Sequence, residues 1–200
     1  LHAGRLGLLG EERGEPRDGD DEVAVVVKPR AQNQMRDAAS RLRPQAVHVL
    51  ALNPRAADDA RTLDTERKAG KLRGPLHGIP ILLKDNIDSA DPLPTTAGSL
   101  ALAKNVTNRD APFVARLRAA GIIVLGKTNL SEWANIRSSQ SISGWSAAGG
   151  LTRNPYARDR NACGSSSGSG AAAAASLAAA TVGTETDGSI TCPASINGLV

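Results

Sequence analysis

Residues 52–71, LNPRAADDARTLDTERKAGK, carry apolar side chains at the spacing of one helix face. Polar and charged residues fill the positions between them, so the pattern predicts a helix. Asn53 is a suitable N-cap residue, Pro54 fits the first helical position, and Gly70 fits the end of the helix. The apolar positions are Ala56, Ala57, Ala60 and Leu63.

Two short, continuous apolar runs follow, and each of them indicates a buried strand. The first run covers residues 79–83, and the second, IIVLGKT, covers 122–128. Helices are expected on either side of the second run, at 110–120 and 129–135, and an alanine-rich helix is expected at 168–180. This alternation favours an α/β architecture in which helices cover a mostly parallel sheet.

Residues 1–47 differ in composition from the rest of the chain. They are rich in Gly, Arg, Asp and Glu, and only EVAVVVK at 22–28 indicates a short strand. We therefore expect a poorly ordered extension that belongs to no assigned domain. Because the chain begins with Leu1 and stops at INGLV, we interpret it as a fragment cut inside a folded element.

Composition narrows the classes of function. The net charge of +4 is spread over interleaved charges, and aromatic residues make up only 2% of the chain, so no nucleic-acid partner is expected. No apolar stretch is long enough to span a membrane, so no membrane partner is expected either. The compartment stays open, with the cytoplasm as the default.

Two cysteines and three histidines offer no pattern of metal ligands, so no metal is expected. Two thiols do not make a disulfide framework. We interpret Cys163 and Cys192 as small buried residues and not as nucleophiles. His77, in the sequence LHG, is expected to be a turn residue.

Residues 164–168, GSSSG, fit the pattern G-x-S-x-G, in which Ser166 would be the nucleophile of a hydrolase. That mechanism needs a histidine later in the chain, whereas His2, His48 and His77 all precede it. The same residues could bind an anion at a helix N-terminus, but the phosphate-loop pattern with its lysine is absent. A flexible linker is the third interpretation.

Lys84 closes the first buried apolar run, in PILLKDN. A lysine at the end of a buried strand is expected to have a partner, and burial favours the neutral amine, which can act as a base. The alternatives are that Lys84 reaches the surface or pairs with Asp85.

Four blocks of sequence together resemble the amidase signature family: GPLHGIPILLKDNID, VLGKTNLSEWAN, CGSSSGSG and GTETDGSI. The resemblance covers residues 48–200 and matches the N-terminal part of a longer domain. It implies the amidase signature fold, with a mostly parallel, mixed central sheet and helices on both faces.

The resemblance also implies a catalytic triad. Ser189 is its nucleophile, Ser165 is a bridging serine that follows a cis peptide bond, and Lys84 is the base. An acyl-enzyme forms on Ser189, ammonia or an amine leaves, and water completes the hydrolysis. No metal and no organic cofactor are implied.

The turn before Ser189 resembles the oxyanion loop of the family, which implies that the backbone N–H groups of Thr186, Asp187 and Gly188 face the developing anion. Ser141 and Ser143 are candidates for lining the substrate channel. Asp85 is expected to order the turn around the lysine, and Glu185 to bind the loop backbone.

Three departures from the usual family pattern bear on the substrate. Asp187 stands where a glycine is usual, Thr191 stands where an arginine is usual, and SSSGSG at 165–170 replaces the more common Ser-Ser-Gly-Gly-Ser. These variants are similar to the branch that contains bacterial peptide amidases, which release ammonia from C-terminally amidated peptides. The sequence therefore predicts a peptide or small-molecule amide as substrate. A glutaminase like the glutamine-hydrolysing component of the tRNA-dependent amidotransferases and an inactive scaffold of the same fold remain as alternatives, and the oligomeric state is unknown.

Overall fold

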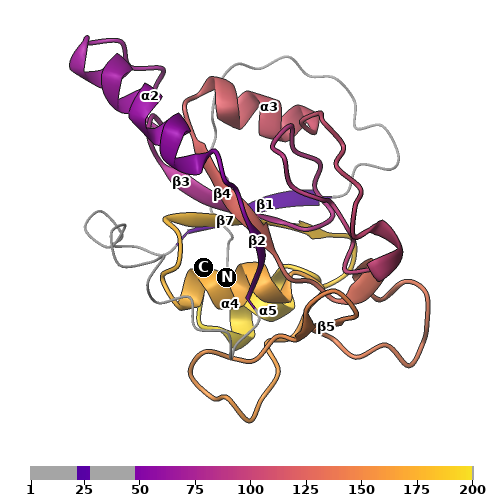
Figure 1. The fold of residues 1–200 in the computed structure, drawn as a ribbon. Coiled ribbons are helices and arrows are strands. Elements are labelled where there is room, and N and C mark those ends of the chain that lie inside the picture. The colour runs from indigo at the N-terminus through magenta and orange to yellow at the C-terminus, as the bar shows by residue number, and fades with distance from the viewer. Residues whose placement is uncertain (1–21, 28–47, 200) are drawn as a thin grey trace, which may run out of the picture.

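A computed structural model describes residues 22–27 and 48–199 of the chain (Figure 1). Its main sheet has five strands in the order β1-β7-β3-β4-β2. The central strands β3 (Pro80–Lys84), β4 (Ile123–Thr128) and β7 (Ala180–Glu185) are parallel. The edge strands β1 (Glu22–Val27) and β2 (Val49–Leu52) run antiparallel to their neighbours. The predicted mixed, mostly parallel sheet is therefore confirmed.

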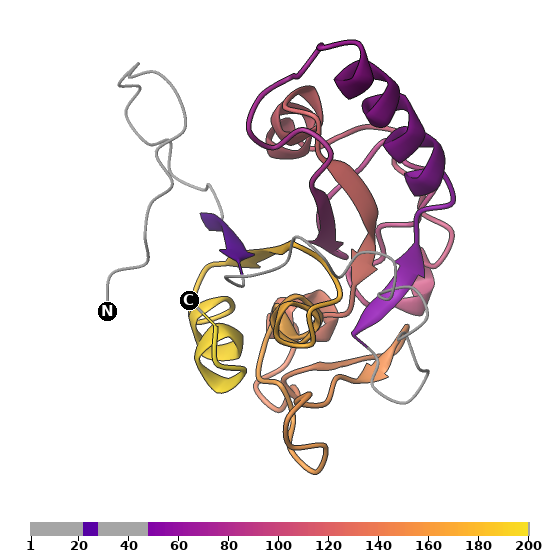
Figure 2. The same ribbon diagram turned by 90° about the vertical axis from the view of Figure 1, so that its left-hand side faces the viewer.

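Helices cover both faces of this sheet (Figures 1 and 2). On one side lie α2 (Ala56–Lys68) and α3 (Pro112–Ala119), and on the other side lie α4 (Ser167–Ala174) and α5 (Thr191–Ile196). The smaller elements are the 3-10 helices η1 (Leu100–Leu102) and η2 (Glu132–Asn135) and the two-stranded sheet of β5 (Trp145–Ser146) and β6 (Gly150–Leu151).

Successive side chains of β3 point to opposite faces of the sheet, so the hydrophobic core has one cluster on each face. Leu83 packs with Val114 of α3, whereas Leu82 packs with Ala172 of α4. Helix α4 can lie close to the sheet because its residues are small, and all of them are buried. At Gly168 an added Cβ would lie 2.5 Å from the backbone of Asn129, so only glycine fits there.

The helix predicted at 168–180 is wrong in its second half. Helix α4 ends at Ala174, and Ser176 adopts a left-handed conformation with φ of 59°. The chain then turns into β7, where Ala180 pairs with Ile81. Pairing with the central strand outweighs the helix propensity of alanine, which is a weak preference for each residue.

The predicted starts of the helices at 52–71 and 110–120 also differ from the structure. The side-chain oxygen of Asn53 accepts a hydrogen bond from the backbone N–H of Arg55, which is the residue before α2. The side-chain amide of Asn53 donates to the carboxylate of Asp91. Helix α3 begins at Pro112, and the carboxylate of Asp110 accepts bonds from Ala90 and Arg118 instead of capping the helix.

The predicted strand at 22–28 is present as β1, and the rest of 1–47 lies outside the described residues. Among the residues that the structure does describe, no helix has the length and apolar character needed to cross a bilayer. Within the same residues, no group of three or more His, Cys, Asp or Glu side chains could hold a metal ion.

Candidate active site

Lys84 ends the central strand β3, and its side chain is fully buried. Its Nζ atom lies 2.7 Å from Ser165 Oγ and 2.8 Å from Thr184 Oγ1. Nζ also donates a hydrogen bond of 3.1 Å to the carbonyl oxygen of Thr184. Because β3 and β7 are parallel neighbours, Lys84 and Thr184 lie side by side at the carboxyl ends of these strands.

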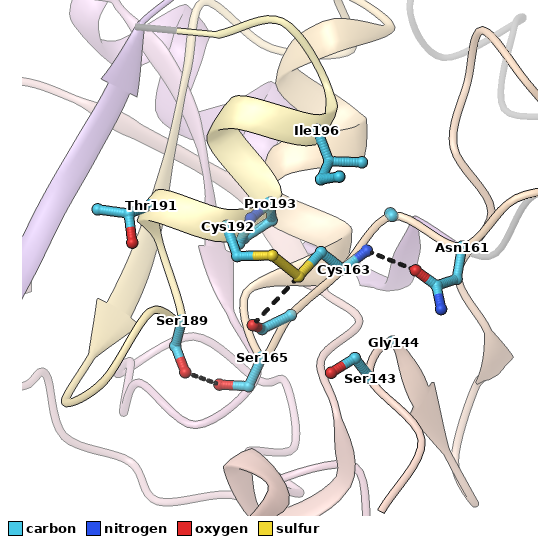
Figure 3. The surroundings of a disulfide bond; sticks show 12 residues. Ser143, Gly144, Asn161, Cys163, Ser165, Ser189, Thr191, Cys192, Pro193 and Ile196 are labelled. Carbon is cyan, nitrogen blue, oxygen red and sulfur yellow. Dashed lines mark hydrogen bonds between the residues drawn. A yellow bond between two sulfur atoms is a disulfide. The ribbon is translucent and has the colours of Figure 1, made fainter. Parts of the chain in front are cut away.

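Ser165 lies on the loop that leads into α4 and is also fully buried. The peptide bond between Gly164 and Ser165 is cis, the geometry that the family resemblance implies for this serine. Its Oγ lies 3.0 Å from Ser189 Oγ, and Figure 3 shows the two hydroxyl groups facing one another. Lys84, Ser165 and Ser189 thus form an unbroken path of hydrogen-bond distances from the core to a half-buried hydroxyl.

Ser166 binds the backbone of β7. Its hydroxyl donates to the carbonyl oxygen of Thr184 at 3.1 Å and accepts from the N–H of the same residue at 3.2 Å. Its backbone N–H donates to the carbonyl oxygen of Ser189 at 3.0 Å. The hydroxyl that G-x-S-x-G would assign as a nucleophile is therefore buried and bound to strand β7, and the backbone N–H of the same residue joins the loop of Ser165 to that of Ser189.

The turn that carries Ser189 is anchored by the carboxylate of Glu185. This carboxylate accepts from the N–H groups of Ile190 and Thr191, each at 3.0 Å, and from the Thr191 hydroxyl at 2.9 Å. The prediction that Glu185 binds the loop backbone is confirmed. An arginine is usual in the family where Thr191 binds Glu185 in this chain.

The residues predicted for the oxyanion hole form the bend directly before the nucleophile candidate. Thr186 and Asp187 are exposed, and Gly188 adopts a positive φ of 71°. The carbonyl oxygen of Gly188 accepts a hydrogen bond of 3.0 Å from Cys192 in the first turn of α5. The role of these three N–H groups stays a prediction.

The two serines predicted to line the substrate channel lie on the loop between η2 and β5. Ser141 is exposed and donates to the carbonyl oxygen of Ser138 at 2.8 Å. Ser143 accepts from the amide of Asn135 at 3.2 Å, and Figure 3 shows it beside the loop of Ser165. Ser143 is therefore the better placed of the two for a contact with substrate.

Sequence reasoning missed Ser131, which joins this loop to the site. Its backbone N–H donates to the carbonyl oxygen of Ser165, and its hydroxyl accepts from the N–H of Gly144 at 2.8 Å. At Gly164 an added Cβ would collide with the same hydroxyl. The block VLGKTNLSEWAN contained this serine, but nothing in its spacing indicated the contact.

Asp85 follows the lysine and is buried. Its carboxylate accepts hydrogen bonds from the backbone and hydroxyl of Thr96, and its backbone carbonyl accepts from the N–H of Ala97. Burial raises the pKa of Asp85, and the bond from Thr96 and the charge of Lys127 partly oppose that rise. Asp85 orders a neighbouring loop, and the backbone bond from Ile87 to the Lys84 carbonyl closes the turn itself.

The interpretation of the two cysteines as small buried residues is wrong. Cys163 and Cys192 form a disulfide, with their Cα atoms 6.0 Å apart. They lie 29 positions apart in the sequence, and folding brings them together because α5 packs beside the loop of Ser165 (Figure 3). His77 lies in a turn, as predicted. Its Nε2 lies 2.8 Å from the carbonyl oxygen of Leu63.

Comparisons with known proteins agree on the family. The sequence profile of the amidase family matches residues 33–200. A protein of Arabidopsis thaliana that carries the name amidase is 49% identical over 166 residues, which cover 82% of this chain and 32% of that protein. A glutamyl-tRNA(Gln) amidotransferase chain of Thermobifida fusca is 45% identical over 154 residues, covering 77% of this chain and 29% of that one.

Among solved structures, the native peptide amidase of Stenotrophomonas maltophilia superimposes with a TM-score of 0.77 and 60% sequence identity. The match covers 82% of this chain and 33% of the peptide amidase. The chain thus spans about a quarter to a third of the length of the relatives it matches.

Proposed function

Because this chain belongs to the amidase family, we propose that the protein hydrolyses carboxylic or peptide C-terminal amides through Lys84, Ser165 and Ser189. The observation that supports the proposal is the path of hydrogen-bond distances from Lys84 Nζ to Ser165 Oγ and on to Ser189 Oγ, at 2.7 and 3.0 Å. A serine hydroxyl becomes a useful nucleophile only when a base within hydrogen-bond reach takes its proton.

In the first step, the neutral amine of Lys84 takes a proton from Ser165 Oγ while Ser165 takes the proton of Ser189 Oγ. This step requires the neutral form of the buried Lys84 amine. Ser189 Oγ then attacks the carbonyl carbon of the amide. Negative charge grows on the carbonyl oxygen, where the N–H groups of the 186–188 bend act as donors, each worth about 3 kcal/mol.

In the second step, the C–N bond breaks and the leaving nitrogen receives a proton from Lys84 by way of Ser165. Ammonia or an amine departs and leaves an ester on Ser189. A water molecule then gives its proton along the same path and attacks the ester, which releases the acid and restores the Ser189 hydroxyl. One base therefore serves both halves of the reaction.

Three features of the chain favour a peptide amide as substrate. Its 60% identity to a peptide amidase is higher than its 45% identity to an amidotransferase chain. Position 191, where an arginine is usual in the family, carries a threonine whose hydroxyl binds Glu185. The half-buried hydroxyl of Ser143 and the exposed hydroxyl of Ser141 supply polar groups on the loop beside the site.

A glutaminase is the second candidate, favoured by the match to the glutamyl-tRNA(Gln) amidotransferase. In that case ammonia would come from free glutamine and pass to a partner protein. An inactive scaffold of the same fold would release ammonia from neither compound.

Ammonia release by the full-length protein separates these candidates. We expect release from a C-terminally amidated dipeptide, little release from glutamine, and no release by the variant Ser189→Ala. Ser195→Ala is the matched control, because Ser195 is an exposed serine on α5. Full amide hydrolysis by Ser189→Ala would overturn the proposal.

A further inference from the structure

We propose that the Cys163–Cys192 disulfide positions the two serines of the active site and makes amide hydrolysis depend on the redox state of the protein. This inference rests on the function proposed above. The disulfide joins the two loops that carry these serines: Cys163 is two residues before Ser165, and Cys192 is three residues after Ser189. Figure 3 shows the sulfur bridge joining the loop of Ser165 to the segment that follows Ser189.

Few other bonds hold these two loops in register near the hydroxyl groups. The backbone N–H of Ser166 donates to the carbonyl oxygen of Ser189 at 3.0 Å. Apart from the contact between the two hydroxyl groups and the bond from Asn197 to Ala162, the anchors of the Ser189 turn lead from Glu185 back to β7. The disulfide is therefore the covalent bond that limits how far the turn of Ser189 can move from Ser165.

We expect a reductant to reach this disulfide. Both cysteines are partly exposed, unlike the buried Ser165 and Lys84 behind them. A dithiol reduces the bond by two thiol–disulfide exchanges: Cys163 and Cys192 become thiols, and the dithiol gives up two electrons and two protons and closes to a cyclic disulfide. Reoxidation reverses each step.

Reduction should loosen the site without unfolding it. The buried side chain of Asn197, at the end of α5, donates to the carbonyl oxygen of Ala162 at 3.0 Å and to that of Pro193 at 2.7 Å. Pro193 also packs closely against Gly170 of α4. These contacts keep α5 docked when the disulfide opens, so the change falls on the distance between the two hydroxyl groups.

The consequence is a loss of turnover. Proton transfer through two serines requires both hydrogen bonds at once, and a shift of about 1 Å costs up to about 10²-fold in rate. We expect reduction to lower kcat about tenfold and to change KM less than about twofold, because KM reports substrate contacts that the disulfide does not make.

The test uses the full-length enzyme, hydrolysing an amidated dipeptide before and after treatment with dithiothreitol, with free thiols counted and circular dichroism recorded. We expect two more free thiols than in the untreated enzyme, an unchanged fold, a roughly tenfold lower kcat and recovery on reoxidation. The double variant Cys163→Ala/Cys192→Ala should show the lower kcat permanently and should not respond to dithiothreitol.

Three results would overturn the inference: an unchanged kcat with both thiols free, a reductant effect that persists in the double variant, or a loss of activity that parallels unfolding. These outcomes are distinct from failure of the proposed function, which would appear as no hydrolysis by the oxidised enzyme or as full hydrolysis by Ser189→Ala.

Discussion

Two buried lysines lie at the carboxyl ends of neighbouring strands, and their surroundings differ: Lys84 is the last residue of β3, and Lys127 is the last but one of β4. Leu83 pairs with Lys127 across β3 and β4, and Lys84 pairs with Thr128. Paired residues point to the same side of a sheet and consecutive residues to opposite sides, so the two amines lie on opposite faces. Lys84 faces α4 and the serine loops, whereas Lys127 lies on the α3 face.

The contacts of the two amines explain why only one of them is a candidate base. Lys127 donates to the carbonyl oxygen of Ile87 and to Thr95 Oγ1, which is itself buried. Burial lowers the pKa of Lys127, and nearby carboxylates, Asp85 first among them, oppose that shift. Lys84 instead contacts a hydroxyl that leads to a half-buried serine. Burial alone does not identify a base, and a path to the substrate is also needed.

The largest effect is expected from Lys84→Ala. This change removes the proposed base, and a general base typically contributes about 10² to 10⁴-fold in rate. We expect kcat/KM for an amidated dipeptide to fall within that range, most strongly near neutral pH. If the pH–rate profile of this variant matches that of the wild type, Lys84 is not the base and the two lysines do not differ in the way proposed.

Lys127→Met should instead affect stability. Its removal leaves the acceptors Ile87 O and Thr95 Oγ1 without this donor in the core, at a cost of about 1–3 kcal/mol per unsatisfied group. We expect urea denaturation to show a lower free energy of unfolding, by about 3 kcal/mol in total. The folded variant should keep kcat within about tenfold of wild type, so a larger loss of kcat would contradict the assignment of Lys127 as structural.

A third prediction separates acid unfolding from titration of the active site. Burial, together with the charge of Arg158, lowers the pKa of His48 from 6.5 to about 4. Between these values the unfolded chain binds the proton that the folded chain does not, so stability is complete above about pH 6.5 and is lost as the pH falls towards 4.

The free energy of unfolding should fall by about 3 kcal/mol through the titration of His48, and urea denaturation at a series of pH values measures this fall. His48→Gln carries no titrating ring and should flatten this part of the profile. If the variant shows the same decline as the wild type, His48 is not its source.

The smallest effect is expected from Thr184→Val, which removes one of the acceptors that orient Lys84 Nζ. The backbone carbonyl of Thr184 and the Ser165 hydroxyl remain, so we expect kcat to fall only about tenfold. Thr184→Ser keeps the hydroxyl and should recover most of the rate in the same steady-state assay.

The sequence predicted the central strands β3 and β4 because both are apolar runs that end in polar residues, whereas it did not predict β2 or β7. The run at 79–83 became β3 almost residue for residue. The position of Lys84 at the strand end followed directly from that run. Its partners Ser165 and Ser189 came from the family resemblance, since no local pattern links positions so far apart.

Features that depend on tertiary contacts were not predictable in this way. The second half of the alanine-rich segment joins β7 because β3 offers a pairing partner there. The disulfide depends on how α5 packs against the loop of Ser165. One signal for it was available, because the resemblance already placed Ser165 beside Ser189, and a cysteine lies within three residues of each.

The most direct test of the relay is the rate at which a fluorophosphonate labels the full-length protein as a function of pH, with the adduct located by mass spectrometry. We predict a single adduct at Ser189 whose rate of formation rises with pH through one ionisation, and we predict that Lys84→Ala removes that rise and slows labelling at least about 10²-fold. Labelling of Lys84→Ala at the wild-type rate, or an adduct at a serine other than Ser189, would contradict the account.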